Sequence, residues 1–185
     1  RALVARQVPK VPAALLRLQA RGAELSRRGA DALLTARAEI GIAMWANPFL
    51  PDPSRLRRLE QALAALPAEE LRLRAALLGR LAVVAGPQLD ADHRARAFAD
   101  DAVDAARRTG DPLLIVQALL DRYISPTTRE ELDARLIVAD EVIPLAERAG
   151  RGDLALQGHQ WRFSHHLNRG EVAAAQKRSQ PMPEV

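Results

Sequence analysis

The stretch RRTGDPLLIVQALLDR, residues 107–122, shows how the chain is built, because a degenerate copy of it, RRGADALLTARAEIGI, stands earlier at 27–42. The two stretches share apolar and polar residues at one fixed offset, which indicates two copies of one structural unit. The identical residues are Arg27, Arg28, Asp31, Leu33, Leu34 and Ala38, matched by Arg107, Arg108, Asp111, Leu113, Leu114 and Ala118.

Two further copies make the repeat regular. The segment at 149–163 repeats the one at 109–123, and AALLGRL at 75–81 matches QALLDRY at 117–123. Related helices therefore recur about every 40 residues, each separated from the next by a more polar helix. This period is typical of an α-solenoid, because one helical pair cannot bury its apolar stripe without a stacked neighbour. The alternative is an antiparallel bundle whose Ala- and Leu-rich helices resemble one another by chance.

The whole chain reads as helix, because no period-2 apolar alternation bounded by turn residues occurs. We predict an all-α fold, a solenoid of about four helical hairpins at 30–177. A basic N-terminal helix or arm at 1–29 and a disordered tail at 178–185 flank it. The predicted helices are 11–28, 31–46, 55–66, 68–85, 90–109, 112–124, 128–149 and 153–168, with another beginning at 172–177.

Helix ends are marked by capping residues. Asp31, Ser54 and Asp153 are predicted N-caps, because a short side-chain oxygen there accepts a hydrogen bond from the first turn. Pro67 is predicted to open the helix at 68–85. Gly110 suits the position after a helix end, where a left-handed conformation favours glycine.

The composition excludes several classes of protein. Apolar residues make up 48% of the chain but aromatic residues only 3%, which favours helices packed through small side chains. The chain has no cysteine, so disulfides, thiolate chemistry and cysteine-ligated zinc are excluded. No apolar run is long enough to span a bilayer, and no signal-peptide core precedes the first arginines. We therefore predict a cytoplasmic protein that does not bind membranes.

The net charge of +4 is unevenly distributed. Residues 1–30 hold seven basic residues against the single acid Glu24, whereas the rest of the chain is slightly acidic. Phosphate binding that weakens steeply with salt could therefore rest only on this N-terminal stretch. The alternative is a solvated arm, because the stretch lacks aromatic residues for base stacking and an obvious recognition helix.

No arrangement typical of catalysis stands out. The serines lack a nucleophile-elbow context. Asp100 and Asp101 adjoin on a polar helix among arginines, whereas a catalytic carboxylate pair needs a shared pocket. His159 and His166 lie two helical turns apart, too far to bind one ion without help. We therefore predict that the chain is not an enzyme and binds no metal or cofactor.

Three segments carry a family resemblance. They are LRRLEQALAALPAEELRLRAALLGRLAVV at 56–84, DDAVDAARRTGDPLLIVQALLDRY at 100–123 and ADEVIPLAERAGRGDLALQGHQWRF at 139–163. Together they resemble the TPR-like helical region of large actinobacterial LuxR-type, ATP-binding transcriptional regulators, over roughly residues 30–177. The resemblance implies a right-handed superhelix of TPR-like pairs whose first helices line a concave face. It also implies that this region senses an inducer or a partner and restrains an ATPase module.

The chain departs from the complete pattern of such regulators. It contains no G-x-x-x-x-G-K-[ST] phosphate loop, and no LuxR-type helix-turn-helix stands out. The ATPase and DNA-binding modules of such a regulator are therefore expected outside this chain, and DNA would be bound only through them.

Polar residues that recur on the repeated helices are the first candidate site. On one helix of each pair they would form a ladder along the concave surface, where arginines bind carboxylates of an acidic peptide or ligand. The alternative is that these side chains lie at the margin of packed helices and bond neighbouring turns. The two aligned sets are Arg37, Gln117 and Gln157, and Arg80, Arg122 and Arg162.

The segment HQWRFSHHLN at 159–168 is the second candidate site. Trp161 and His165 are four positions apart on one helix, so they could form a stacking platform for an aromatic ligand. The alternative is that Trp161 makes a core or inter-helix contact.

The function predicted from these residues is a regulatory module that binds a partner protein, a peptide or a small inducer in a concave groove. The alternatives are a stand-alone TPR-like adaptor and a helical protein that binds a small molecule near Trp161. Terminal repeats of a solenoid need polar caps, and the chain does not complete the helix predicted to begin at 172–177. Self-association as a homo-oligomer, or a continuation of the chain, is therefore expected.

Overall fold

The computed structural model describes residues 31–44, 50–86, 92–124 and 132–171, together with Arg17, Arg21 and Glu24. Within these ranges the ordered elements are all helices and no strand occurs, which confirms the predicted all-α class. The helices are α2 (Ala32–Ala43), α3 (Pro53–Ala65), α4 (Leu71–Ala85), α5 (Asp92–Thr109), α6 (Pro112–Ile124), α7 (Leu132–Arg148) and α8 (Gly152–Asn168). Most of the predicted arm at 1–29, the predicted helix start at 172–177 and the tail at 178–185 lie outside the described residues.

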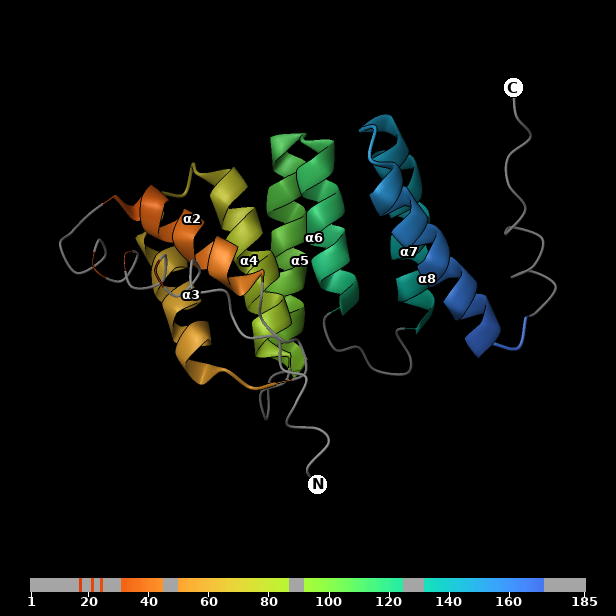
Figure 1. The fold of residues 1–185 in the computed structure, drawn as a ribbon, viewed down its shortest axis with the longest axis horizontal. Helices are drawn as coiled ribbons and strands as arrows, with labels where there is room; N and C mark the ends of the chain where they lie inside the picture. Colours follow the sequence, from red (N-terminus) through yellow and green to blue (C-terminus); the bar gives the residue numbers. More distant parts are fainter. Residues whose placement is uncertain are drawn as a thin grey trace.

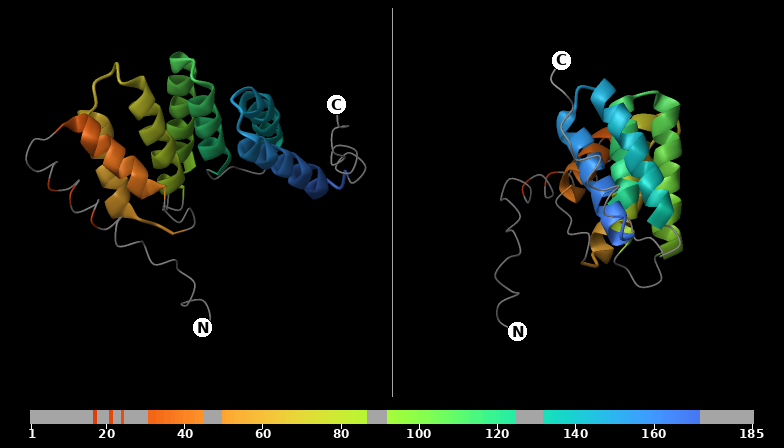
Figure 2. Two further views of the ribbon diagram at one scale, coloured as in Figure 1. Left: turned by 45° about the horizontal axis from the view of Figure 1, so that its top comes forward. Right: turned by 90° about the vertical axis from the view of Figure 1, so that its right-hand side faces the viewer.

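The helices follow one another in a row from α2 to α8 (Figure 1; Figure 2). Among the described helices, every extensive contact joins helices that are at most two places apart in the chain. Helices α2, α4 and α6 pack directly on one another, and α3, α5 and α7 alternate with them along the row. The chain therefore stacks its helices in sequence order, as neighbouring repeats do.

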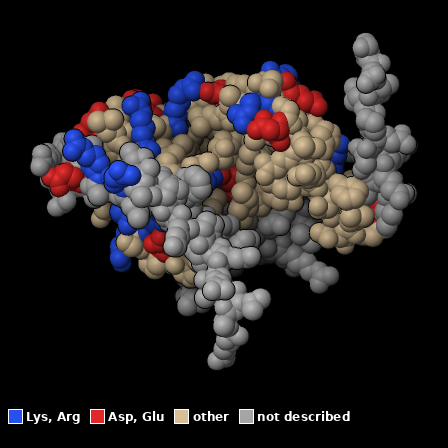
Figure 3. Space-filling view, viewed as in Figure 1, with Lys and Arg blue, Asp and Glu red and all other residues tan. Residues whose placement is uncertain are grey.

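One side of this row is hollowed. In the right-hand view of Figure 2, helices α2 and α8 lie to the left of α5 and α6, the side that faces the viewer in Figure 1. Figure 3 shows a hollow near the centre of the same side, with charged side chains gathered mainly around its edges. The side on which this hollow opens is called the inner face below.

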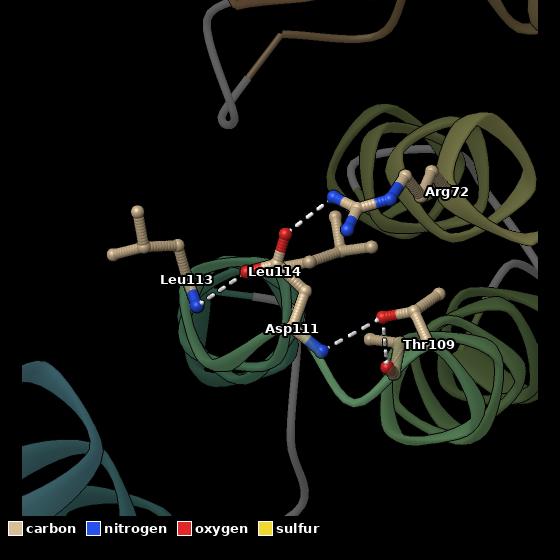
Figure 4. A network of polar contacts seen from close by, with 6 residues as sticks. Arg72, Thr109, Asp111, Leu113 and Leu114 are labelled. Carbon is tan, nitrogen blue, oxygen red and sulfur yellow. Dashed lines mark hydrogen bonds and ion pairs between the residues drawn. The ribbon is translucent and has the colours of Figure 1, made fainter. Parts of the chain in front are cut away.

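The repeated aspartates are repeated helix caps. The Asp31 carboxylate accepts a hydrogen bond of 2.9 Å from the Leu33 N–H, and the Asp111 carboxylate accepts one of 3.0 Å from the Leu113 N–H. The predicted cap at Asp31 is confirmed. Figure 4 shows that Arg72 of α4 also reaches the Asp111 carboxylate, and this hydrogen bond lowers the pKa of Asp111. One repeated residue thus begins a helix and ties α4 to α6.

The predicted starts of α3 and α4 are wrong. The cap of α3 is Asp52, whose carboxylate accepts a hydrogen bond of 2.9 Å from the Arg55 N–H, and not Ser54. Pro53 occupies the first turn of α3, where its missing N–H costs nothing, so the helix begins earlier. Residues 67–70 form a turn in which the Glu70 N–H donates to the Pro67 carbonyl, so α4 begins only at Leu71.

The predicted cap at Asp153 is also wrong. Arg151 occupies the N-cap position of α8, one repeat after the capping Asp111, and makes no side-chain cap bond. Its guanidinium instead donates to both Asp153 carboxylate oxygens, at 2.9 and 2.7 Å, and these bonds lower the pKa of Asp153 to about 2. The preceding Gly110 and Gly150 have φ values of 68° and 67°, the conformation predicted for Gly110 after a helix end.

The core runs along the row as two joined clusters. One lies among α2, α3, α4 and α5, the other reaches from α4 to α8, and Leu63 and Phe98 pack against both. The largest fully buried apolar side chains are Leu59, Leu77, Leu81 and Leu119. Each such leucine stabilises the fold by roughly 1.5–3 kcal/mol through burial. Within the described part of the chain, no helix has both the length and the apolar character needed to cross a bilayer.

Candidate functional site

The repeated arginines of α6 and α8 make the same ion pair in successive hairpins. Arg122 Nη2 of α6 lies 3.0 Å from Asp100 Oδ1 of α5. Arg162 Nη1 of α8 lies 3.2 Å from Asp140 Oδ1 of α7. The two arginines and the two aspartates are separated by the same number of positions, one repeat length. The repeat read from the sequence is therefore a repeat of contacts as well.

Arg80 aligns with these arginines but is used differently. Its side chain is buried between α4 and α6, where its guanidinium pairs with the buried Asp121 of α6. The Arg80 Nε–H donates to Asp121 Oδ2 at 3.2 Å, and Gln117 Nε2 donates to Asp121 Oδ1 at 3.0 Å. Burial lowers the pKa of Arg80 to about 10, so the group remains charged at neutral pH. Little of the Arg80 side chain is therefore exposed to a ligand.

Gly79 explains why the Arg80–Asp121 pair fits between α4 and α6. A Cβ at Gly79 would overlap Asp121 Oδ2 and lie 3.2 Å from Asp121 Cγ. The missing side chain therefore makes room for the carboxylate, and α4 and α6 pack extensively. The equivalent positions of α6 and α8 hold Asp121 and Trp161. The side chain at this position therefore becomes larger from α4 to α6 to α8.

Between α6 and α8 the contact is aromatic. The rings of Tyr123 and Trp161 stack with centroids 3.6 Å apart and planes 1° from parallel. Extensive contacts of α8 are made with α7 and not with α6. The large Trp161 side chain thus bridges α6 and α8, where Gly79 lets α4 and α6 close together.

The predicted platform residues, Trp161 and His165, lie on one helix and differ in their surroundings. The structure places Trp161 against Tyr123 of the preceding hairpin and places His165 in the interior. Arg162 also lies 3.0 Å from His159 Nδ1, which links the repeated arginine to the histidine-rich segment. Alignment with Phe163 marked Tyr123 as a repeated aromatic position, but it could not show which ring meets Trp161.

The remaining predicted residues lie apart from this network. Arg37 is exposed on α2, and Gln157 is half-buried on α8. Among the described residues, no three His, Asp or Glu side chains are grouped so that they could hold a metal ion. The acidic partners Asp100, Asp121 and Asp140 were not predicted to belong to the site. The one sequence signal for them was that Asp100 and Asp140 stand one repeat length apart.

Comparisons with known proteins add no relative. No family model, curated protein or solved structure matches the chain. The candidate site is therefore defined by its geometry alone: paired arginines on α6 and α8 beside an aromatic contact between those helices.

The Tyr123–Trp161 stack is expected to couple the last two hairpins. In a double-mutant cycle of Tyr123→Leu and Trp161→Leu, we expect a coupling energy of about 0.5–1.5 kcal/mol. The measurement is urea denaturation followed by circular dichroism. A control cycle combines Tyr123→Leu with Phe163→Leu, which removes an exposed ring on α8, the helix of Trp161. This control cycle should show a coupling energy near zero. Equal coupling in both cycles would contradict a specific stack.

Proposed function

We propose that the chain is the regulatory module of a transcriptional regulator, a TPR-like solenoid that binds a partner protein, a peptide or a small inducer on its inner face. The proposal is supported by helices stacked in sequence order, by the hollow of Figure 3 and by the resemblance of three segments to such a region. The observation that carries it is the equivalent ion pairing of Arg122 and Arg162 in successive hairpins.

These arginines have the chemistry to recognise carboxylates. A guanidinium offers a fork of donors that matches two carboxylate oxygens, and Arg122 and Arg162 present this fork at the same position of successive hairpins. Their partners Asp100 and Asp140 are exposed enough for water to compete for the pair. Exposed pairs are typically worth about 0–1 kcal/mol, so an incoming carboxylate can replace Asp100 beside the half-exposed Arg122 at little cost. Arg162 is more deeply buried, so a carboxylate must reach it from the side of the exposed Asp140.

Acidic ligands should therefore bind through both arginines. With a glutamate-rich peptide and with succinate as probes, we expect Arg122→Ala and Arg162→Ala each to weaken binding on the order of tenfold, because a charge-assisted hydrogen bond is worth about 1.5–3 kcal/mol. Isothermal titration calorimetry measures the affinity. Arg108→Ala and Arg148→Ala are matched controls, since these exposed arginines are also one repeat apart but lie on α5 and α7. If all four substitutions weaken binding equally, or if none does, Arg122 and Arg162 are not the residues that bind the acidic ligand.

The assignment to a regulator has its own test. A phosphate-loop ATPase sequence before this segment and a helix-turn-helix sequence after it, in one reading frame, would support a regulator. An uninterrupted gene with neither module would instead favour the stand-alone adaptor. Sequencing the flanking gene distinguishes the two without reference to the arginines.

A further inference from the structure

An exposed apolar stripe runs along α8. Leu156 is 59% exposed, Phe163 is 40% exposed and Leu167 is 43% exposed. Spacings of seven and four positions place the three side chains on one face of the helix, with exposed Gln160 between the first two. This stripe, Leu156–Gln160–Phe163–Leu167, is called the α8 stripe below. It covers about three turns.

The equivalent face of α6 is covered. Val116 aligns with Leu156 in the repeat and is 0% exposed, and Leu120 aligns with Gln160 and is also buried. Helix α6 packs against α4, α5 and α7, whereas among the described helices α8 makes extensive contacts only with α7. The same repeat position is therefore a packing position on α6 and an open apolar position on α8.

The charges around the stripe match those of a second, antiparallel copy. Between Asp153 and Arg169 the exposed residues of α8 carry no charge. The helix begins beside the Arg151–Asp153 pair and ends beside the Arg169–Glu171 pair, so each end presents one cation and one anion. An antiparallel copy brings opposite ends together, where the pairs can exchange partners and the helix dipoles oppose. A parallel copy would align like charges and like dipole ends.

We propose that the α8 stripe is the dimerisation surface of this protein and that its occupant is the α8 stripe of a second copy, packed antiparallel about a two-fold axis. Such an interface is self-complementary: Leu156 lies opposite Leu167 of the second copy, and Gln160 lies opposite its Phe163. It buries apolar surface on both copies while leaving the charged ends at the rim. This inference is independent of the proposed ligand, because the stripe does not include Arg122 or Arg162.

The first test is the mass in solution. Sedimentation velocity over a range of concentrations should give a dimer for the native chain. Leu156→Glu and Leu167→Glu should each raise the dimer dissociation constant at least about tenfold, with circular dichroism unchanged. Leu34→Glu is the matched control, since Leu34 is 45% exposed on α2 at the other end of the row. A native monomer at all concentrations, or a dimer indifferent to both stripe substitutions, would overturn the proposal.

The second test fixes the orientation. The chain has no cysteine, so one introduced thiol reports one contact. Leu156→Cys and Leu167→Cys chains are mixed and oxidised. The disulfide that joins one Leu156→Cys chain to one Leu167→Cys chain should form in excess over the disulfides that join two identical chains. Leu113→Cys, at an exposed leucine of α6, should give no enrichment with either. An excess of Leu156→Cys homodimer would contradict the antiparallel arrangement.

Discussion

Replacing Arg80 with alanine should lower the free energy of unfolding by about 3–5 kcal/mol. The substitution removes the buried cation and leaves the Asp121 carboxylate between α4 and α6, with Gln117 still donating to it. A buried anion that loses its cation bears a desolvation cost which its former partner offset. Urea denaturation monitored by circular dichroism measures the change.

Two comparison variants separate the loss of charge pairing from the loss of packing. Arg80→Met combined with Asp121→Leu removes both charges, so most of the stability lost in Arg80→Ala should return. Arg122→Ala removes the aligned but half-exposed arginine and should cost no more than about 1 kcal/mol. A loss below about 1 kcal/mol for Arg80→Ala would show that Asp121 does not depend on this pair.

Replacing Gly79 with alanine should destabilise the protein by about 1–3 kcal/mol, although alanine favours a helix. The new Cβ would overlap Asp121 Oδ2, and Asp121 cannot turn aside without breaking its bonds to Arg80 and Gln117. The steric cost therefore exceeds the gain of roughly 0.5–1 kcal/mol that alanine brings to a helix interior. Urea denaturation measures the net change in the free energy of unfolding, which combines the steric cost with the gain in helix propensity.

The matched control is Gly41→Ala in α2. Gly41 is exposed, and a Cβ there would meet no atom within 4 Å, so this variant should gain up to about 1 kcal/mol. The two substitutions make the same chemical change in two helices and should shift stability in opposite directions. Stabilisation of both would mean that α4 and α6 can separate without loss.

The bounds of a helix were predicted correctly where residues within a few positions of each end determine where it starts and stops. Helix α6 has the predicted bounds, Pro112–Ile124, because Gly110 ends the preceding helix and Pro112 suits a first turn. The start of α3 was mispredicted because two side chains that can cap a helix, Asp52 and Ser54, stand two positions apart, and Asp52 is the one that caps. At α8 the predicted cap Asp153 lies inside the first turn, and its carboxylate accepts hydrogen bonds from Arg151.

The candidate site was predictable only in part, for a reason visible in three aligned arginines. The repeat marked Arg80, Arg122 and Arg162 as equivalent, and two of them do make equivalent ion pairs. Arg80 departs because Gly79 opens space for Asp121, a residue 41 positions away in the chain. No spacing within one helix carries that information.

The order of residues along the chain was enough to establish that the protein is helical and that its helices recur about every 40 residues, because helix formation and capping depend on neighbours within one or two turns. Which charges are buried, which rings stack and which apolar face stays open became apparent only from the packed helices. Those outcomes depend on how closely two helices approach. That distance is set by the size of side chains that meet from distant parts of the chain, glycine between α4 and α6 and tryptophan between α6 and α8.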